Sequence, residues 1–354
     1  MKITVVGAGN AGTTVAADLS LKGHEVTILK TSNSLHNENF NTILNNGYKI
    51  NLIRNNESRE AKLHLVTTDF KEALEGSELI ILYVQTNYQE DVIKRMSKYL
   101  YNQIILIEPG YLATLFFLKE CKDKPLIYAE AESSPIDCRI TKPGEVTAMF
   151  ENVRNPIGIY PKSRTKEALE KLELLQYNFI PTKNIVEAAL HNPNLIVHTI
   201  GAFMSIPRIE YTDGKEYWMY KEVFTKSVWN MVNGLDKEKM DIMETLGCER
   251  ISYVEACKFR NSLISNMDAE AVFFDYAKNH STSGPYTSDS RYITEDVPEG
   301  LVLMESLGKY LEIDTPVCTS LIELSSSSLN RDFRSEGRTI ERIGIENFKA
   351  ILEI

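Results

Sequence analysis

The first part of the chain alternates between short apolar runs and amphipathic stretches. Ile3–Val6 is a compact β-branched run, which predicts a buried strand. Ala11–Lys22 follows with apolar residues at helical spacing, and Gly23 ends that pattern. Glu25–Leu29 then predicts a second strand. The chain therefore opens with a strand–helix–strand unit.

Further apolar runs continue this alternation. Leu79–Val84 and Ile104–Ile107 predict strands that are covered on both faces, as in a parallel sheet. Glu90–Leu100, which lies between them, predicts a helix. Residues 126–160 carry several more strand-like pieces, which we expect to close the same sheet. The pattern predicts an α/β domain with a doubly wound, mostly parallel sheet.

Helical periodicity replaces this pattern near residue 183. The predicted helices are Ile185–Leu190, Asp236–Leu246, Val254–Tyr276, Leu301–Leu311 and Pro316–Leu329. The run Ser325–Ser328 has apolar flanks, so we interpret it as a small-residue helix face and not as a linker. We therefore predict two domains, residues 1–183 with the sheet and residues 184–354 with helices only.

Composition narrows the class of protein. A chain of 354 residues suits two domains. Its net charge is -10 and it has no dense Lys/Arg block, which argues against nucleic-acid binding. The five cysteines match no zinc or CxxC spacing, so we expect reduced thiols. Because the chain has neither a membrane-length apolar run nor a signal-peptide pattern at its start, we expect a soluble, cytoplasmic protein.

A glycine-rich loop follows the first strand. Residues 7–12 read GAGNAG, a GxGxxG pattern between a strand and a helix. Gly7 allows a tight turn, Gly9 lets a pyrophosphate approach the backbone, and Gly12 lets the helix pack close to the strand. Asn10 and Ala11 begin the helix, whose free N–H groups favour phosphate. The alternative is a glycine-rich turn without a ligand, but the context favours a Rossmann dinucleotide-binding domain.

The second strand indicates which dinucleotide binds. NAD-specific domains usually carry Asp or Glu at its end, for the ribose 2′-hydroxyl. Here the strand ends in Leu29-Lys30-Thr31-Ser32, without a carboxylate. Lys30 and Ser32 suit a 2′-phosphate, so we predict a preference for NADP(H), with NAD(H) as the alternative. The other interpretation of Lys30 is a solvated charge at the strand end.

Three further segments carry a family resemblance: HNPNLIVH at residues 191–198, RYITEDVP at 291–298 and ESSPIDCR at 132–139. With the glycine loop, they make almost the whole chain resemble the octopine/nopaline (opine) dehydrogenase family. The resemblance implies a Rossmann domain followed by a helical domain like the C-terminal domain of 6-phosphogluconate dehydrogenase. It implies an NAD(P)-dependent oxidoreductase acting on CH–NH bonds, which condenses an amino acid with a 2-oxo acid and reduces the imine.

The same resemblance implies roles for single residues. His198 corresponds to the catalytic histidine, Asp296 to its carboxylate partner and Arg291 to the group that binds a substrate carboxylate. The positions that line the substrate site in family members are Glu132, Ser133 and Cys138. The chemistry suits these residue types: histidine exchanges protons near neutral pH, and guanidinium binds carboxylates through two hydrogen bonds. A buried Asp partner is expected to fix the histidine tautomer and to raise the imidazole pKa.

Each of these residues also has an ordinary structural interpretation. His198 could be a buried core histidine, Asp296 a helix N-cap and Arg291 a solvated loop charge. Glu132 could be a carboxylate at a sheet end, and Cys138 a small buried hydrophobic residue. No Cys, Asp or Glu cluster accompanies the two histidines of the first segment, so we expect no metal site.

Three functions remain open on this sequence. The favoured one is an opine-type dehydrogenase that acts on small-molecule substrates. A 2-oxo acid reductase similar to ketopantoate reductase and a non-catalytic NADP(H)-binding sensor are the alternatives. The sequence does not name the amino acid, the oxo acid, the product stereochemistry or the physiological direction, and it leaves monomer and homodimer open.

Overall fold

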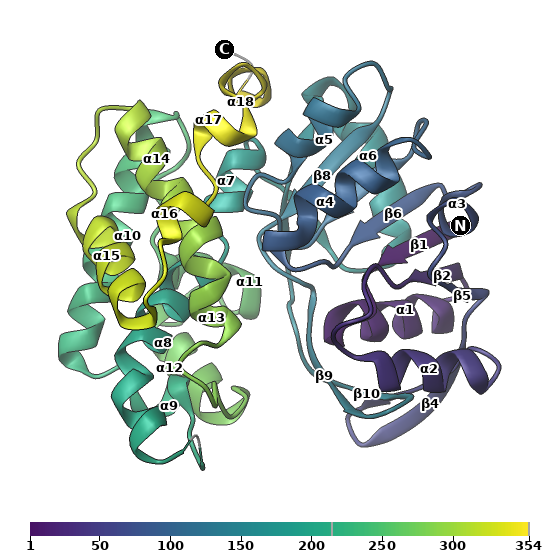
Figure 1. Cartoon of the computed structure of the whole chain (residues 1–354), viewed down its shortest axis with the longest axis horizontal. Coiled ribbons are helices and arrows are strands. Elements are labelled where there is room, and N and C mark those ends of the chain that lie inside the picture. The colour runs from purple at the N-terminus through teal and green to yellow at the C-terminus, as the bar shows by residue number, and fades with distance from the viewer. Residues whose placement is uncertain (214, 353–354) are drawn as a thin grey trace. The chain divides into compact units, whose positions relative to one another are not determined.

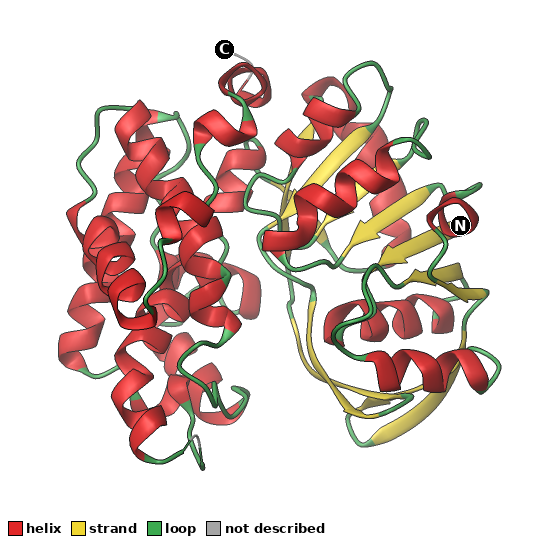
Figure 2. Cartoon of the chain, in the orientation of Figure 1, coloured by secondary structure: helices red, strands yellow, loops and turns green. Residues whose placement is uncertain are grey.

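The structure is a computed structural model that describes residues 1–213 and 215–352, and it divides into two units, Met1–Ala188 and Ala189–Ile354. The division falls inside α7 (Ile185–Leu190), a few residues after the boundary expected at 183. Figure 2 shows that the named strands belong to the first unit and that the described part of the second unit is built from helices. The predicted fold class is confirmed.

An eight-stranded sheet forms the centre of the first unit. The strand order is β12-β11-β8-β7-β6-β1-β2-β5. The strands are β1 (Lys2–Val6), β2 (Glu25–Leu29), β5 (Leu65–Thr67), β6 (Leu79–Leu82), β7 (Ile104–Ile107), β8 (Ile127–Ala131), β11 (Asn155–Tyr160) and β12 (Phe179–Pro181). All neighbours pair in parallel except β11, which is antiparallel to β8. Because β1 has β2 on one side and β6 on the other, strand order reverses at β1, where doubly wound folds bind ligands.

A second sheet corrects one expectation. Residues 126–160 were expected to close the main sheet, but only β8 and β11 do so. Their intervening hairpin pairs elsewhere, in a four-stranded sheet of order β4-β3-β10-β9. Its strands are β3 (Lys49–Arg54), β4 (Glu57–Lys62), β9 (Ile136–Lys142) and β10 (Glu145–Glu151). The pairing of β10 with β3 joins segments far apart in sequence, so local periodicity carried no sign of it.

Helix α1 (Asn10–Leu21) lies between the two sheets and contacts strands of both. Every residue from Gly12 to Leu19 is buried, as expected of a helix covered on all sides. The other helical segments of this unit are α2 (Asn37–Asn45), α3 (Phe70–Leu74), α4 (Thr86–Ser97), α5 (Thr114–Glu120) and α6 (Thr165–Leu172), with short 3-10 turns at Lys162–Arg164 and Glu173–Leu175. Helices α4 and α5 pack together, across the main sheet from α1 (Figure 1).

The second unit is a helical assembly. Its segments are α8 (Asn194–Tyr211), α9 (Met219–Glu222), α10 (Lys226–Thr245), α11 (Tyr253–Asn261), α12 (Ala269–Asn279), α13 (Arg291–Thr294), a π-helical turn (Val297–Leu301), α14 (Val302–Tyr310), α15 (Pro316–Leu329), α16 (Phe333–Glu336), α17 (Ile340–Ile343) and α18 (Ile345–Leu352). The serine run at 325–328 lies inside α15, as predicted.

One helix prediction in this unit was wrong. Val254–Tyr276 was expected to be a single helix, but it divides into α11 and α12. The Asp268 carboxylate accepts a hydrogen bond from the Ala271 backbone N–H and starts α12, just as Ser252 caps α11. Apolar residues continue across the break, so the prediction missed the capping signal at Asp268.

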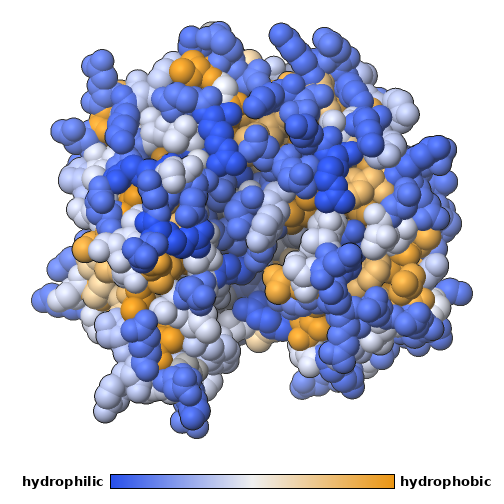
Figure 3. All heavy atoms as spheres, viewed as in Figure 1, coloured by the Kyte–Doolittle hydropathy of each residue, from blue (hydrophilic) through white to orange (hydrophobic). Residues whose placement is uncertain are grey.

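No helix in the described part of the chain is both long and apolar enough to cross a membrane. The face drawn in Figure 3 is mainly hydrophilic, with hydrophobic residues scattered in small areas between hydrophilic ones. Scattered hydrophobic residues of this kind are normal on protein surfaces.

Candidate active site

The glycine loop has the geometry that the sequence predicts. Gly7 follows β1 with φ +117°, and a Cβ there would lie 2.3 Å from the Tyr83 carbonyl oxygen. At Gly12, a Cβ would lie 2.0 Å from the Gly7 carbonyl oxygen. Only glycine therefore fits at either position. Gly9 precedes the first turn of α1 without a capping side chain, which leaves backbone N–H groups for a phosphate.

The two residues that open α1 differ in what their side chains do. The Asn10 side-chain oxygen accepts a hydrogen bond from the Ile140 backbone N–H at 2.8 Å. Asn10 thus ties the loop to β9, and its backbone is the part that faces the phosphate position. Ala11 is half-buried and packs against the hydrophobic core. Both residues hold the start of α1 in place.

The segment after β2 places Lys30 in an unexpected way. Lys30 is buried, and its amine donates to the Leu35 carbonyl oxygen at 2.6 Å. Burial lowers the pKa of this amine. Ser32 is exposed and hydrogen-bonds Ser34 at 3.0 Å. Lys30 therefore stabilises the loop through this hydrogen bond, and it is not a solvated charge at the strand end.

His36 is a residue that sequence reasoning missed. It is exposed, has a φ of 58°, and immediately precedes α2. Its ring carbon Cδ2 lies 3.7 Å from the position that a Cβ on Gly9 would take. Burial lowers the pKa of His36, and the charge of Lys30 lowers it further. The β2 loop thus places this imidazole beside the glycine loop.

In the second unit, His198 and Asp296 form a buried pair. His198 Nδ1 lies 2.8 Å from Asp296 Oδ2, although 98 positions separate the two residues in the chain. Exposed fractions are 5% for His198 and 2% for Asp296. The Tyr292 ring stacks on the imidazole at 3.6 Å between centroids, with the planes 8° apart. The Asp296 hydrogen bond and the Tyr292 stacking together fix the orientation of the imidazole ring.

Local structure explains how these residues meet. His198 projects from α8, while Arg291 and Tyr292 open the single turn of α13. Asp296 follows that turn and precedes the π-helical turn Val297–Leu301. Its carboxylate makes no N-cap hydrogen bond, so the alternative of a simple helix cap does not describe it. π-Helical turns are rare in proteins, and those that do occur are often found at functional sites.

Asp296 does raise the imidazole pKa, as expected, but the net shift of His198 is downward. Burial lowers the pKa of His198, and this outweighs the opposing effect of Asp296, while Arg291 lowers the pKa further. The imidazole is therefore neutral near pH 7, with Nδ1–H donating to Asp296 and Nε2 left as the basic nitrogen.

Arg291 and the first-unit substrate residues occupy different settings. The Arg291 side chain is half-exposed and pairs with Glu295 at 3.2 Å, which orients the guanidinium. Glu132 is buried just after β8. Ser133 accepts a hydrogen bond from the Asn152 amide at 3.3 Å. Cys138 lies in the hydrophobic core on β9, where burial raises the pKa of its thiol to about 11, so it is an uncharged thiol at neutral pH.

The carboxyl edge of the main sheet carries a further polar cluster that the sequence did not predict. Tyr83 follows β6, Glu108 follows β7 and Ser134 follows β8. The Tyr83 hydroxyl hydrogen-bonds the Glu108 carboxylate and lies 3.1 Å from the Ser134 hydroxyl. An acidic residue directly after the apolar strand Ile104–Ile107 was the available sequence signal for this cluster.

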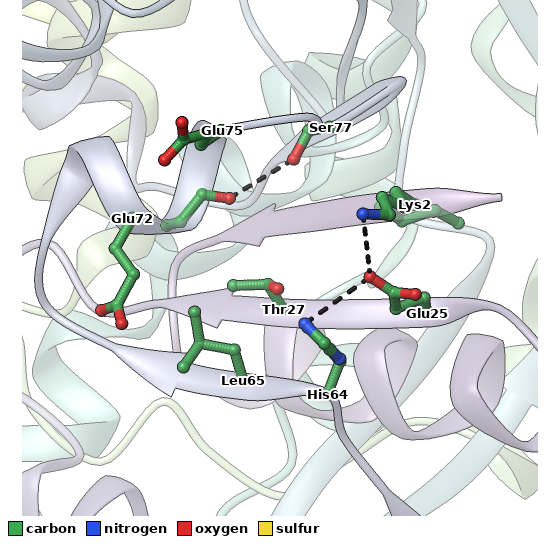
Figure 4. Close-up of a pocket in the computed structure, with 10 residues that line it drawn as sticks. Lys2, Glu25, Thr27, His64, Leu65, Glu72, Glu75 and Ser77 are labelled. Carbon is green, nitrogen blue, oxygen red and sulfur yellow. Dashed lines mark hydrogen bonds and ion pairs between the residues drawn. The ribbon is translucent and has the colours of Figure 1, made fainter.

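A pocket lies at the other edge of the same sheet (Figure 4). Lys2 at the start of β1 and His64 before β5 each approach Glu25 Oε1 at 3.5 Å. Since β1 runs from Lys2 toward Gly7, this pocket is at the amino edge of the strands, away from the glycine loop. It is therefore separate from the glycine loop.

The described residues contain no group of three or more His, Cys, Asp or Glu that could hold a metal ion.

Comparison with protein families identifies the two units. Residues 2–109 match the NAD-dependent glycerol-3-phosphate dehydrogenase N-terminus. Residues 181–329 match the NAD/NADP octopine/nopaline dehydrogenase alpha-helical domain. A nicotinamide-nucleotide fold thus precedes a dehydrogenase helical domain, and the glycine loop and the buried His–Asp pair lie inside these matches.

Individual relatives match over nearly the full length. An opine dehydrogenase of Arthrobacter sp. (strain 1C) is 26% identical over 353 residues, which covers 98% of this chain and 96% of the relative. A vitopine synthase of Allorhizobium ampelinum is 26% identical, covering 97% and 95%. A solved octopine dehydrogenase with NADH and L-arginine superposes with a TM-score of 0.79 at 17% identity, covering 100% and 98%.

More distant folds are also similar. A ketopantoate reductase from Ralstonia eutropha superposes with a TM-score of 0.63 at 15% identity, covering 95% of this chain and 99% of that one. The domains and site define an NAD(P)-dependent oxidoreductase. Within that class, the helical unit matches the octopine/nopaline dehydrogenase domain, and the chain as a whole is similar to opine dehydrogenases.

Proposed function

We propose that this protein is an opine dehydrogenase, which joins an amino acid to a 2-oxo acid and reduces the resulting imine with hydride from NAD(P)H. The product is an N-(carboxyalkyl) amino acid, and the reverse reaction oxidises its CH–NH bond. The observation that supports this proposal most directly is the buried His198–Asp296 contact at 2.8 Å. A sensor that only binds a nucleotide has no need for a buried, oriented imidazole in its helical unit.

The proposed chemistry uses the neutral form of His198. Condensation of an amine with a carbonyl forms a C–N bond and releases water, so a proton must reach the departing oxygen. Nε2 of His198 accepts a proton from the attacking amine and passes it to the departing oxygen, while Asp296 holds Nδ1–H and stabilises the imidazolium that forms between these two transfers. The nicotinamide supplies the hydride when bound. Arg291 binds the carboxylate of the 2-oxo acid through two hydrogen bonds and so orients the carbonyl carbon.

The substrate class follows from charge. A 2-oxo acid carries a carboxylate, which suits Arg291. Glu132, Ser133 and Cys138 are proposed to line the amino-acid site, where the Glu132 carboxylate favours a cationic or amine-rich side chain. Solved octopine dehydrogenase complexes contain L-arginine, agmatine or pyruvate. We therefore propose basic amino acids and pyruvate as the first substrates to test.

The cofactor site fits a dinucleotide, since only glycine fits at Gly7 and Gly12, where the strand turns tightly into the helix. We propose that the protein prefers NADP(H). The β2 loop has no carboxylate to bind the ribose 2′-hydroxyl, and Ser32 and His36 are among its exposed hydrogen-bond donors. Solved relatives contain NADH or NADP+, so the family fold accepts both. Parallel fluorescence titrations with NADPH and NADH test the preference, and tighter NADH binding would contradict it.

The decisive experiment follows NADPH oxidation with each common amino acid combined with pyruvate or 2-oxoglutarate. We expect turnover only when amine and oxo acid are present together. Oxidation with the oxo acid alone would instead indicate a simple reductase of the ketopantoate reductase kind. Tight cofactor binding without turnover on the whole panel would indicate a nucleotide sensor. His198→Ala is expected to abolish turnover while NADPH binding persists, and unchanged turnover in that variant would remove the catalytic assignment.

A further inference from the structure

The polar cluster of Tyr83, Glu108 and Ser134 lies on the part of the sheet that faces the second half of a dinucleotide. Doubly wound domains bind the two mononucleotides across the carboxyl edge, on either side of the strand where the order reverses. In this protein that strand is β1, which Gly7 follows, and β2 with its loop lies on the side that binds one mononucleotide. Strands β6, β7 and β8 serve the other half, and each contributes one member of the cluster just beyond its carboxyl end.

The cluster is held directly against the glycine loop. The Tyr83 backbone N–H donates to the Val6 carbonyl oxygen at 2.8 Å, and the Tyr83 carbonyl oxygen is the atom that a Gly7 side chain would strike. The Gln89 amide donates to the carbonyl oxygens of Val84 and Pro109, both at 3.2 Å. These bonds fix the loops that carry Tyr83 and Glu108, so the cluster is a rigid part of the dinucleotide-binding edge.

Glu108 has one carboxyl oxygen in use and one unused. Its Oε2 accepts the hydrogen bond from Tyr83. Its Oε1 is buried and has no hydrogen-bond partner among the described residues, and Glu108 as a whole is 3% exposed. A buried carboxyl oxygen without a partner is costly, which indicates that a ligand group supplies the missing hydrogen bond.

We propose that Glu108, held by Tyr83, is a positioning residue for the nicotinamide end of the cofactor and senses its charge. The free Oε1 accepts a hydrogen bond from the carboxamide N–H group of the nicotinamide. The oxidised ring is a cation and the reduced ring is neutral. An ionised Glu108 therefore favours the oxidised nucleotide, whereas a protonated Glu108 does not distinguish the two by charge. The inference rests on the proposed nicotinamide cofactor.

The charge state of Glu108 changes in an accessible pH range. Burial raises its pKa to about 8, with the Tyr83 hydrogen bond acting in the opposite direction. Tyr177 is a further titratable group that interacts electrostatically with both members of the pair. Glu130 on β8 lies against the same loop, but its carboxylate accepts the Leu112 backbone N–H at 2.6 Å and serves the loop structure. Glu108 is thus the carboxyl group of this cluster that has an oxygen left for a ligand.

The direction of the pH effect follows from linkage. Above pH 8 the carboxylate attracts the cationic ring, so the affinity for the oxidised nucleotide rises as pH rises through this range. The affinity for the reduced form gains nothing from the same ionisation. Comparing the oxidised and reduced forms of one nucleotide cancels the contributions of its phosphates and adenosine.

The test measures the Kd of NADP+ and of NADPH from about pH 6 to about pH 10, on the full-length protein without substrates. We expect the ratio of the two affinities to shift about tenfold toward NADP+ across this range. Glu108→Gln keeps the shape of the side chain and removes its ionisation, and should make the ratio independent of pH. Calorimetry in buffers of different ionisation enthalpy should show proton release when NADP+ binds to the wild type, and none in the variant.

Two further variants separate positioning from structure. Tyr83→Phe removes the hydrogen bond that lowers the Glu108 pKa, so the affinity ratio should change at a higher pH than in the wild type. Glu120→Gln removes an equal charge from an exposed position on α5 and should behave as the wild type. A pH-independent ratio in the wild type, or an unchanged pH response in Glu108→Gln, overturns the inference and leaves the proposed function standing. Failure of both nucleotides to bind overturns both proposals.

Discussion

The Asp296→Asn variant is the sharpest test of the proposed acid–base chemistry. The carboxylate accepts Nδ1–H of His198 at 2.8 Å in a site where both side chains are almost completely buried. Asparagine has the same shape, but its amide offers an N–H donor as well as an oxygen. It can therefore stabilise the tautomer with the proton on Nε2, which is the wrong nitrogen for proton exchange with substrate.

The magnitude follows from two losses. General acid–base catalysis contributes about 10²–10⁴-fold to rate, and a misplaced tautomer removes most of it. That range corresponds to about 3–5 kcal/mol of transition-state stabilisation. The carboxylate also opposes the effect of burial on the His198 pKa, so its removal lowers that pKa further and makes imidazolium still scarcer at neutral pH.

The assay is steady-state NADPH oxidation with saturating amino acid and 2-oxo acid, recorded as a function of pH. We expect kcat to fall by the stated factor while the Kd of NADPH is unchanged. The part of the pH profile that reports His198 should move to lower pH. If Asp296→Asn folds normally and keeps kcat within about threefold of the wild type, the pair is structural and the acid–base assignment is wrong.

Three other predictions concern distinct parts of the molecule. Tyr292→Phe keeps the ring stacked on His198 and should retain turnover, whereas Tyr292→Ala should lower kcat about tenfold through a loosened imidazole; equal kcat in the two variants would contradict this. Glu305 is paired with Arg334, and this contact lowers its pKa to about 2, so its contribution of about 2 kcal/mol to folding is present above pH 4.5 and lost as pH falls toward 2. Acid unfolding monitored by circular dichroism should show Glu305→Gln losing less stability than the wild type over that range. Gly12→Ala forces a methyl against a backbone oxygen and should destabilise the first unit by about 2–3 kcal/mol, measured as a fall in Tm and a loss of NADPH binding.

The alternating strands, the glycine loop and the change to helices near residue 183 could be predicted because each depends on neighbours in sequence. Strand β2 (Glu25–Leu29) has the same bounds in prediction and structure, since its apolar run is ended on both sides by polar or glycine residues. The family resemblance likewise selected His198 and Asp296, and the structure brings them into contact. The functional roles of the site residues stay predictions.

What the tertiary structure decided is the environment of each group. The pairing of β10 with β3, the burial of Lys30 and the lowered pKa of His198 depend on segments distant in the chain. Ionisation in particular is set by desolvation, which sums over every element packed around a side chain and has no signature in local sequence. Glu108 shows the limit most clearly: the sequence placed a carboxyl group after a strand, and only folding gave it a buried tyrosine partner and a second oxygen without a hydrogen-bond partner among the described residues.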